Sequence, residues 1–314
     1  MAESKPVIYA AMGGNLMIAI SKFVAAAITG SSAMLSEGIH SVVDTGNQVL
    51  LLLGIKRANR PPSAQFPFGH GKEVYFWSFV VALLLFSVGS GISLYEGIHH
   101  ILNPEPLESP LVSYGVLGLG ILFEGASWAF ALHQFRKTKG KWSYVEAVRR
   151  GKDPSMFVVV FEDSAALLGL LAALVGIALS QWTGNSIFDG IASIVIGMIL
   201  GGTAIWLAIE TKGLLIGESA NRSVVEGIRQ LASEAEGVER VNEVLTMHMG
   251  PDFILVTLSV RFVRGIPAER IERAIAELDR RIKAEHDTVK RVYVEAEARA
   301  GVDSQLNHGE GSEA

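Results

Sequence analysis

The segment Ala33–Ile55 reads AMLSEGIHSVVDTGNQVLLLLGI. It exceeds the roughly 20 residues that a helix needs to cross a bilayer, and most of its residues are apolar. His40 and Asp44 interrupt the apolar run four residues apart, so they lie one turn apart on the same helix face. An ionised side chain at the bilayer centre costs roughly 2.5–3.5 kcal/mol on insertion scales, so it needs a partner, a cavity or an ion. The pair therefore indicates a polar site inside a membrane helix.

The rest of the first two thirds of the chain is also apolar. Of the 314 residues, 49% are hydrophobic and only 19% are charged, whereas soluble proteins carry about 25% charged residues. Six stretches reach the length of a membrane span, and lipid makes each one helical because every backbone polar group must be satisfied within the segment. The predicted spans are Val7–Thr29, Ala33–Ile55, Val74–Ile101, Val112–Phe135, Pro154–Leu179 and Ile187–Thr211.

The loops between these spans alternate in charge. Lys and Arg gather in the loops after the second and fourth spans, and the other three loops contain neither residue. Basic loops face the cytoplasm in membrane proteins. We therefore predict a multi-pass protein with cytoplasmic N- and C-termini, and we place it in the bacterial inner membrane.

The composition changes after residue 213. Residues 1–213 form the predicted transmembrane domain, and residues 214–300 show mixed helical and strand periodicity that predicts a small cytoplasmic α+β domain. The expected helices are Ser223–Glu234 and Pro267–Lys283, and the expected strands are Val241–Met249, Phe253–Val263 and Val292–Val294. The polar stretch 301–314 is predicted to be a disordered tail.

Charge and cysteine content exclude several function classes. From Glu218 onward the chain has 18 Asp and Glu against 13 Lys and Arg, which accounts for the whole net charge of −5. An acidic region of this kind argues against nucleic-acid binding. The chain has no cysteine, so disulfides, thiolate metal ligands and a cysteine nucleophile are excluded. A metal site must then use histidine and oxygen ligands.

The fifth span contains two adjacent acids, Glu162 and Asp163, in an apolar run. Neighbouring residues point about 100° apart on a helix, so we expect only one of them to ligate directly. A cation between the second and fifth spans would relieve their repulsion. Imidazole and carboxylate ligands suit Zn²⁺, and also Mn²⁺, Fe²⁺ or Co²⁺. Protons compete with metal for His40, which gives a physical basis for proton/metal exchange.

Other interpretations of the polar residues remain open. His40 and Asp44 could form a purely structural contact between helices. Asn15 and Lys22 in the first span could form polar contacts between helices, with Lys22 extending toward the membrane surface along its aliphatic stem. Glu124 is expected to be a lone buried acid that serves helix packing or supports a metal ligand without coordinating the metal. Glu37 is expected to be a polar residue toward the outer side rather than a ligand.

These motifs resemble the cation diffusion facilitator family of zinc and divalent-metal transporters. The resemblance rests on residues 31–44, on the loop FGHGK at 68–72, on Asp189 and on the trailing domain, and residues 162–166 are similar to the zinc transporter nine-like branch. It implies a homodimer, a ferredoxin-like cytoplasmic domain and a transport site of His40, Asp44 and Asp163. It also implies export by proton antiport with alternating access.

One position departs from the family pattern. The family has His or Asp four residues before the fifth-span aspartate, where this chain has Val159, which cannot ligate a metal. Either water completes the site or Glu162 substitutes for the missing ligand.

We therefore predict a transporter rather than an enzyme, without a prosthetic group. It would bind protons and export Zn²⁺, or Mn²⁺, Fe²⁺ or Co²⁺, from the cytoplasm across the lipid bilayer. The alternative is a transport-deficient membrane scaffold or metal sensor that acts through its cytoplasmic domain. An intramembrane hydrolase is not favoured, because no HExxH pairing is present.

Overall fold

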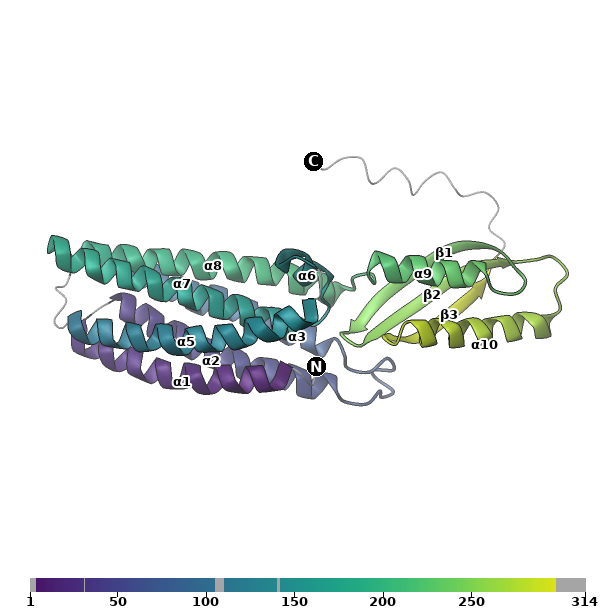
Figure 1. The fold of residues 1–314 in the computed structure, drawn as a ribbon, viewed down its shortest axis with the longest axis horizontal. Coiled ribbons are helices and arrows are strands. Elements are labelled where there is room, and N and C mark those ends of the chain that lie inside the picture. The colour runs from purple at the N-terminus through teal and green to yellow at the C-terminus, as the bar shows by residue number, and fades with distance from the viewer. Residues whose placement is uncertain (1–3, 31, 105–109, 140–141, 298–314) are drawn as a thin grey trace, which may run out of the picture. The chain divides into compact units, whose positions relative to one another are not determined.

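The computed structural model describes residues 4–30, 32–104, 110–139 and 142–297 (Figure 1). They fall in two compact units that divide between Ile216 and Gly217. The stretch 301–314, predicted to be disordered, lies outside the described residues.

The first unit consists of helices that run side by side (Figure 1). They are α1 (Ser4–Thr29), α2 (Ser32–Ala58), α3 (Glu73–Leu84), α4 (Gly91–Leu102), α5 (Pro110–Lys139), α6 (Tyr144–Arg150), α7 (Pro154–Thr183) and α8 (Ile187–Ile216). The π-helical segment η1 (Leu85–Ser90) joins α3 to α4, so these three elements form one rod that corresponds to the third predicted span.

Five of these helical segments are long and apolar enough to cross a membrane, which confirms the prediction of a helical membrane protein. They are Ala11–Thr29, Glu73–Leu102, Leu111–Lys137, Pro154–Thr183 and Ile187–Ile216. The sixth predicted span corresponds to α2, which has 27 residues but a lower mean hydropathy. Its internal Glu37, His40 and Asp44 lower that mean, and all three side chains are buried against other helices.

The short helix α6 was not predicted, because its seven residues lie in a basic loop. Its N-terminus carries a signal that the sequence does contain. The Ser143 side chain accepts a hydrogen bond from the backbone N–H of Glu146 at 3.2 Å. This Ser-x-x-Glu spacing is the capping box that begins many helices.

Helices α4 and α8 approach each other through glycines. A Cβ atom placed on Gly97 would lie 2.7 Å from the carbonyl oxygen of Gly190. Nearby, the Ser90 hydroxyl donates a hydrogen bond of 2.7 Å to the carbonyl oxygen of Gly197. Small residues at such a contact let the backbones pack closely, which is the usual basis of helix association in membranes.

Gly97→Ala is therefore expected to destabilise the helical unit by about 1–3 kcal/mol, because the added methyl meets backbone atoms that cannot move aside. Gly202→Ala on α8 is the matched control, since a Cβ there meets nothing within 4 Å. Alanine in a helix is favoured over glycine, so the control should be neutral or stabilising. Thermal unfolding of the detergent-solubilised protein measures both, and equal shifts would contradict this packing.

The second unit is a small α+β domain, as predicted. It contains α9 (Arg222–Ser233), β1 (Val238–Gly250), β2 (Phe253–Phe262), α10 (Ala268–Glu285) and β3 (Val289–Ala296). The sheet order is β1-β2-β3, with β1 antiparallel and β3 parallel to β2. The core includes Ile228, Val256, Leu258, Leu278 and Ile282. The described strands number three, whereas a complete ferredoxin-like unit has four.

Candidate metal site between helices α2 and α7

Helix α2 carries a continuous row of buried polar side chains along one face. Residues three and four positions apart share a face of a helix, so the row follows from the sequence spacing. Its members, each at most 1% exposed, are Glu37, His40, Ser41, Asp44, Asn47 and Gln48. Such a row is stable in a membrane helix only if neighbouring helices supply partners for it.

His40 and Asp44 contact each other within this row. The Nε2 atom of His40 lies 3.2 Å from Oδ2 of Asp44. Among the described residues, neither His40 Nδ1 nor Asp44 Oδ1 has a hydrogen-bond partner, although both atoms are buried. Buried polar atoms are normally satisfied. A cation or its bound water would satisfy these two, and both atoms are of kinds that ligate divalent metals.

Glu162 of α7 faces this pair. Its Oε1 atom accepts a hydrogen bond from Asn47 Nδ2 of α2. Its Oε2 atom is buried and has no hydrogen-bond partner among the described residues. The structure thus places His40, Asp44 and Glu162 along the interface between α2 and α7.

Asp163 points in a different direction from its neighbour. Its Oδ2 atom accepts a hydrogen bond of 3.1 Å from the Ser127 hydroxyl of α5. The two carboxyls therefore diverge, as the angle between successive helical residues requires. In the parts of the chain that the structure describes, no three His, Asp or Glu side chains converge closely enough to hold a metal ion.

The site residues that sequence reasoning passed over are the hydrogen-bond donors Asn47 and Ser127. Asn47 lies three residues after Asp44, so its place on the polar face of α2 could have been found from spacing alone. Ser127 has no such signal, because its role depends on how α5 and α7 are rotated against each other.

Comparison with known proteins identifies the family. Residues 8–216, which span all the helices of the first unit and the site between them, match the cation efflux transmembrane domain. The chain belongs to the cation efflux, or cation diffusion facilitator, family. Members of this family are transporters rather than enzymes.

This cation efflux protein has relatives with different named metals. The mitochondrial proton-coupled zinc antiporter SLC30A9 of Xenopus laevis is 35% identical over 244 residues, 77% of this chain and 44% of that protein. Metal tolerance protein C4 of Arabidopsis thaliana is 31% identical over 75% of this chain and 55% of its own length. The manganese efflux system protein MneP of Bacillus subtilis is 23% identical over 93% of this chain and 95% of its own. The chain spans about half the length of the first two relatives.

Val159 of the cation efflux protein is fully buried in the core of the helical unit. It lies one turn before Asp163 on α7. An isopropyl group offers no lone pair to a metal. The hydrogen bond from Asn47 to Glu162 instead turns a carboxylate toward α2 from the position next to Asp163.

Lys22 does not extend to the membrane surface, contrary to expectation. Its side chain is fully buried, and its Nζ atom donates hydrogen bonds to Glu37 Oε2 at 3.0 Å and to Ser41 Oγ at 2.8 Å. Its Nζ atom also lies 4.0 Å from Glu124 Oε1, so Glu124 is not a lone acid. Taking a charge out of water is costly, and pairing offsets that cost. The buried carboxylates hold the lysine inside the bundle.

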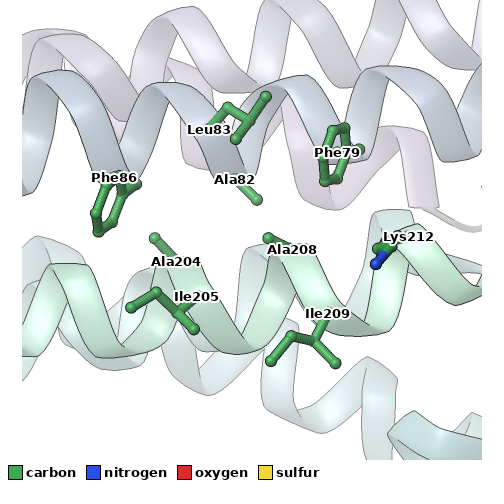
Figure 2. Close-up of a pocket in the computed structure, with 9 residues that line it drawn as sticks. All are labelled: Phe79, Ala82, Leu83, Phe86, Ala204, Ile205, Ala208, Ile209 and Lys212. Atoms are coloured by element: carbon green, nitrogen blue, oxygen red, sulfur yellow. The ribbon is translucent and has the colours of Figure 1, made fainter.

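A groove on the helical unit has a different character from this site. It has a volume of about 290 Å³ and lies where α3 and η1 face α8 (Figure 2). Its lining residues are Phe79, Ala82, Leu83, Phe86, Ala204, Ile205, Ala208, Ile209 and Lys212. None of these nine side chains is a carboxylate or an imidazole, so the groove offers no metal ligand.

The geometry predicts unequal roles for the two adjacent acids of α7. Glu162→Gln is expected to weaken zinc binding by at least about tenfold, because removal of a group that only hydrogen-bonds to a metal ligand already lowers metal affinity by about that factor. Asp163→Asn should have the smaller effect, since Asp163 faces Ser127 rather than Asp44. Calorimetric titration of the purified variants with Zn²⁺ measures both affinities. A larger loss in Asp163→Asn would show that α7 turns differently when metal is bound.

Proposed function

We propose that this cation efflux protein exports a divalent metal ion from the cytoplasm by alternating access, in exchange for protons. Zn²⁺ is the expected cargo, with Mn²⁺, Fe²⁺ or Co²⁺ as related substrates. The observation that carries the proposal is the fully buried pair of His40 and Asp44 on α2, which Glu162 faces from α7. One imidazole and two carboxylates form a donor set that these ions share.

The exchange with protons rests on the same atoms. A metal binds to deprotonated imidazole and carboxylate, so metal binding releases protons and protonation releases metal. A site of this kind alternates between two cargoes without a separate binding pocket. The names of two relatives, a proton-coupled zinc antiporter and a manganese efflux protein, agree with this range of substrates.

The orientation and assembly of the protein are part of the same proposal. The basic loops after the second and fourth spans support cytoplasmic N- and C-termini. A bacterial inner membrane stays our prediction for the location. The family resemblance supports a homodimer. No prosthetic group is required, because the metal ion is the cargo.

One observation favours a second function. Val159 removes a ligand of the family pattern, and the described residues bring no three ligating side chains together. A chain that had lost transport could act as a membrane scaffold or metal sensor through its α+β domain. In that case the buried acids of α2 and α7 would serve helix packing alone.

Calorimetric titration of the purified protein with Zn²⁺, Mn²⁺, Fe²⁺ and Co²⁺ separates the two functions. The transporter proposal predicts binding at micromolar or lower concentration that is lost in Asp44→Asn. Absence of binding by the unmodified protein for every metal would favour the scaffold. The order of affinities across the panel identifies the preferred cargo.

A further inference from the structure

The proposed metal site does not use the ion cluster formed by Lys22, Glu37 and Glu124. These residues come from α1, α2 and α5, and all three side chains are fully buried. One ammonium group faces two carboxyl groups in this cluster. With both carboxyls ionised the cluster would carry a net negative charge in the interior of the helical unit, and a single proton would neutralise it.

The partners of the two carboxyls are unequal. Glu37 accepts a hydrogen bond of 3.0 Å from Lys22, which also donates one of 2.8 Å to Ser41. Glu124 has Lys22 only at 4.0 Å, and neither of its oxygens has a hydrogen-bond partner among the residues that the structure describes. A buried carboxylate is normally hydrogen-bonded. A proton bound to Glu124 would therefore remove the net negative charge of the cluster.

The surrounding backbone makes room for the cluster. Gly169 of α7 lies against the Glu37 carboxyl group, and a Cβ atom at this position would overlap Glu37 Oε1. At Gly120 of α5 the nearest atom of Lys22, Cε, would be 3.8 Å from an added Cβ. The absence of a side chain at position 169 is therefore what allows Glu37 to reach Lys22 between α1 and α7.

The cluster is electrostatically connected to the metal site. The charged or titratable groups that act on it from the neighbouring helices are His40 and Asp44 of α2 and Glu162 and Asp163 of α7. Lys22 donates a hydrogen bond of 2.8 Å to Ser41, the residue that follows His40 on α2, and Glu124 lies 4.0 Å from the same ammonium group. A divalent cation bound between α2 and α7 would therefore favour the ionised form of Glu124, and loss of that cation would favour its protonated form.

We propose that Glu124 is a proton-binding residue, separate from the metal site, that releases its proton when the metal binds and takes one up when the metal leaves. The proton passes between a carboxyl oxygen of Glu124 and water, and no other bond changes. This inference rests on the proposed function, and it assigns part of the proton exchange to a residue that does not touch the metal.

Glu124→Gln tests the inference, because glutamine has the shape of the protonated acid and cannot release a proton. Calorimetric zinc titrations in buffers of different ionisation enthalpy give the number of protons released per bound Zn²⁺. We expect Glu124→Gln to bind Zn²⁺ and to release fewer protons than the unmodified protein, by up to about one per ion. Glu124→Asp, which keeps the carboxyl group, should release the original number. Glu272→Gln, an exposed acid of α10, is the control and should change nothing.

An unchanged proton number in Glu124→Gln would overturn the inference while leaving metal transport in place. Failure of the unmodified protein to bind Zn²⁺ would instead remove the proposed function, and the inference with it. Infrared difference spectroscopy gives a second measurement that does not depend on how Glu124→Gln folds. The carbonyl band of a protonated carboxyl should disappear on zinc addition and should be shifted in Glu124→Asp. A band that is identical in Glu124→Asp and the unmodified protein would overturn the assignment.

Discussion

Replacement of Asp44 by alanine is expected to lower zinc uptake into proteoliposomes by at least about 100-fold. Loss of a group that only supports a metal ligand lowers activity by up to about 100-fold, and loss of a ligand itself should lower it at least as much. Asp44 contacts His40 at 3.2 Å and also faces Glu162, so its loss affects both halves of the proposed site. The initial rate of uptake, followed with an enclosed zinc-sensitive dye, measures the effect.

Asp252→Ala provides the matched control for this experiment. Asp252 is an exposed carboxylate in the turn between β1 and β2, far along the sequence from α2. It should transport zinc at the rate of the unmodified protein. Uptake by Asp44→Ala within about twofold of that rate would show that Asp44 serves structure alone, since a lost metal ligand cannot have so small an effect.

Lys22→Met is expected to have the largest effect on stability, about 3–5 kcal/mol, which is typical for removal of one partner from a buried ion pair. The substitution leaves the fully buried Glu37 without the counter-charge that it contacts at 3.0 Å. Methionine keeps the length and apolar stem of lysine, so packing changes little. Reversible unfolding of the detergent-solubilised protein by a denaturing detergent measures the difference.

The double variant Lys22→Met with Glu37→Gln separates electrostatics from packing. Residues that contact each other directly do not give additive changes in stability. The double variant should recover a substantial part of the stability that Lys22→Met loses, because the carboxylate that Lys22 contacts directly is no longer charged. Additive losses in the two single variants would contradict a direct charge interaction between Lys22 and Glu37.

The helices of this protein could be predicted from its sequence, because lipid leaves few alternatives to an apolar run of sufficient length. In helix α2 the spacing of the polar residues supports the prediction of a helix where hydropathy alone is weak. Its mean hydropathy is the lowest of the long helices in the first unit. Its histidine and acids nevertheless follow helical spacing, and that spacing also located the face on which His40 and Asp44 meet.

The rotation of the helices against one another could not be predicted. Adjacent residues of α7 turn toward different helices, Glu162 toward α2 and Asp163 toward α5, and only packing decides which way each one faces. The same limit explains the error on Lys22, whose partners lie on other helices. The π-helical segment η1 also depends on local packing, since nothing in LFSVGS distinguishes it from an ordinary helix.

The α+β domain was easier to predict because alternation marks its strands. In β2 the residues Ile254, Val256, Leu258 and Val260 are all buried, as the period of two requires. The prediction that β1 begins at Val241 is three residues late, because the strand starts at Val238 and register shifts interrupt its early pairing with β2. Irregular pairing breaks the alternation from which a strand is recognised.

We propose that metal and protons exchange through buried residues of α2 and α7. Simultaneous recording of zinc and pH inside proteoliposomes tests this exchange, with a proton gradient imposed in the absence of any zinc gradient. We expect zinc to accumulate in the acidic interior while protons leave, and both fluxes to disappear together in Asp44→Ala. Zinc entry at the rate of protein-free vesicles, or zinc movement that ignores the proton gradient, would contradict it.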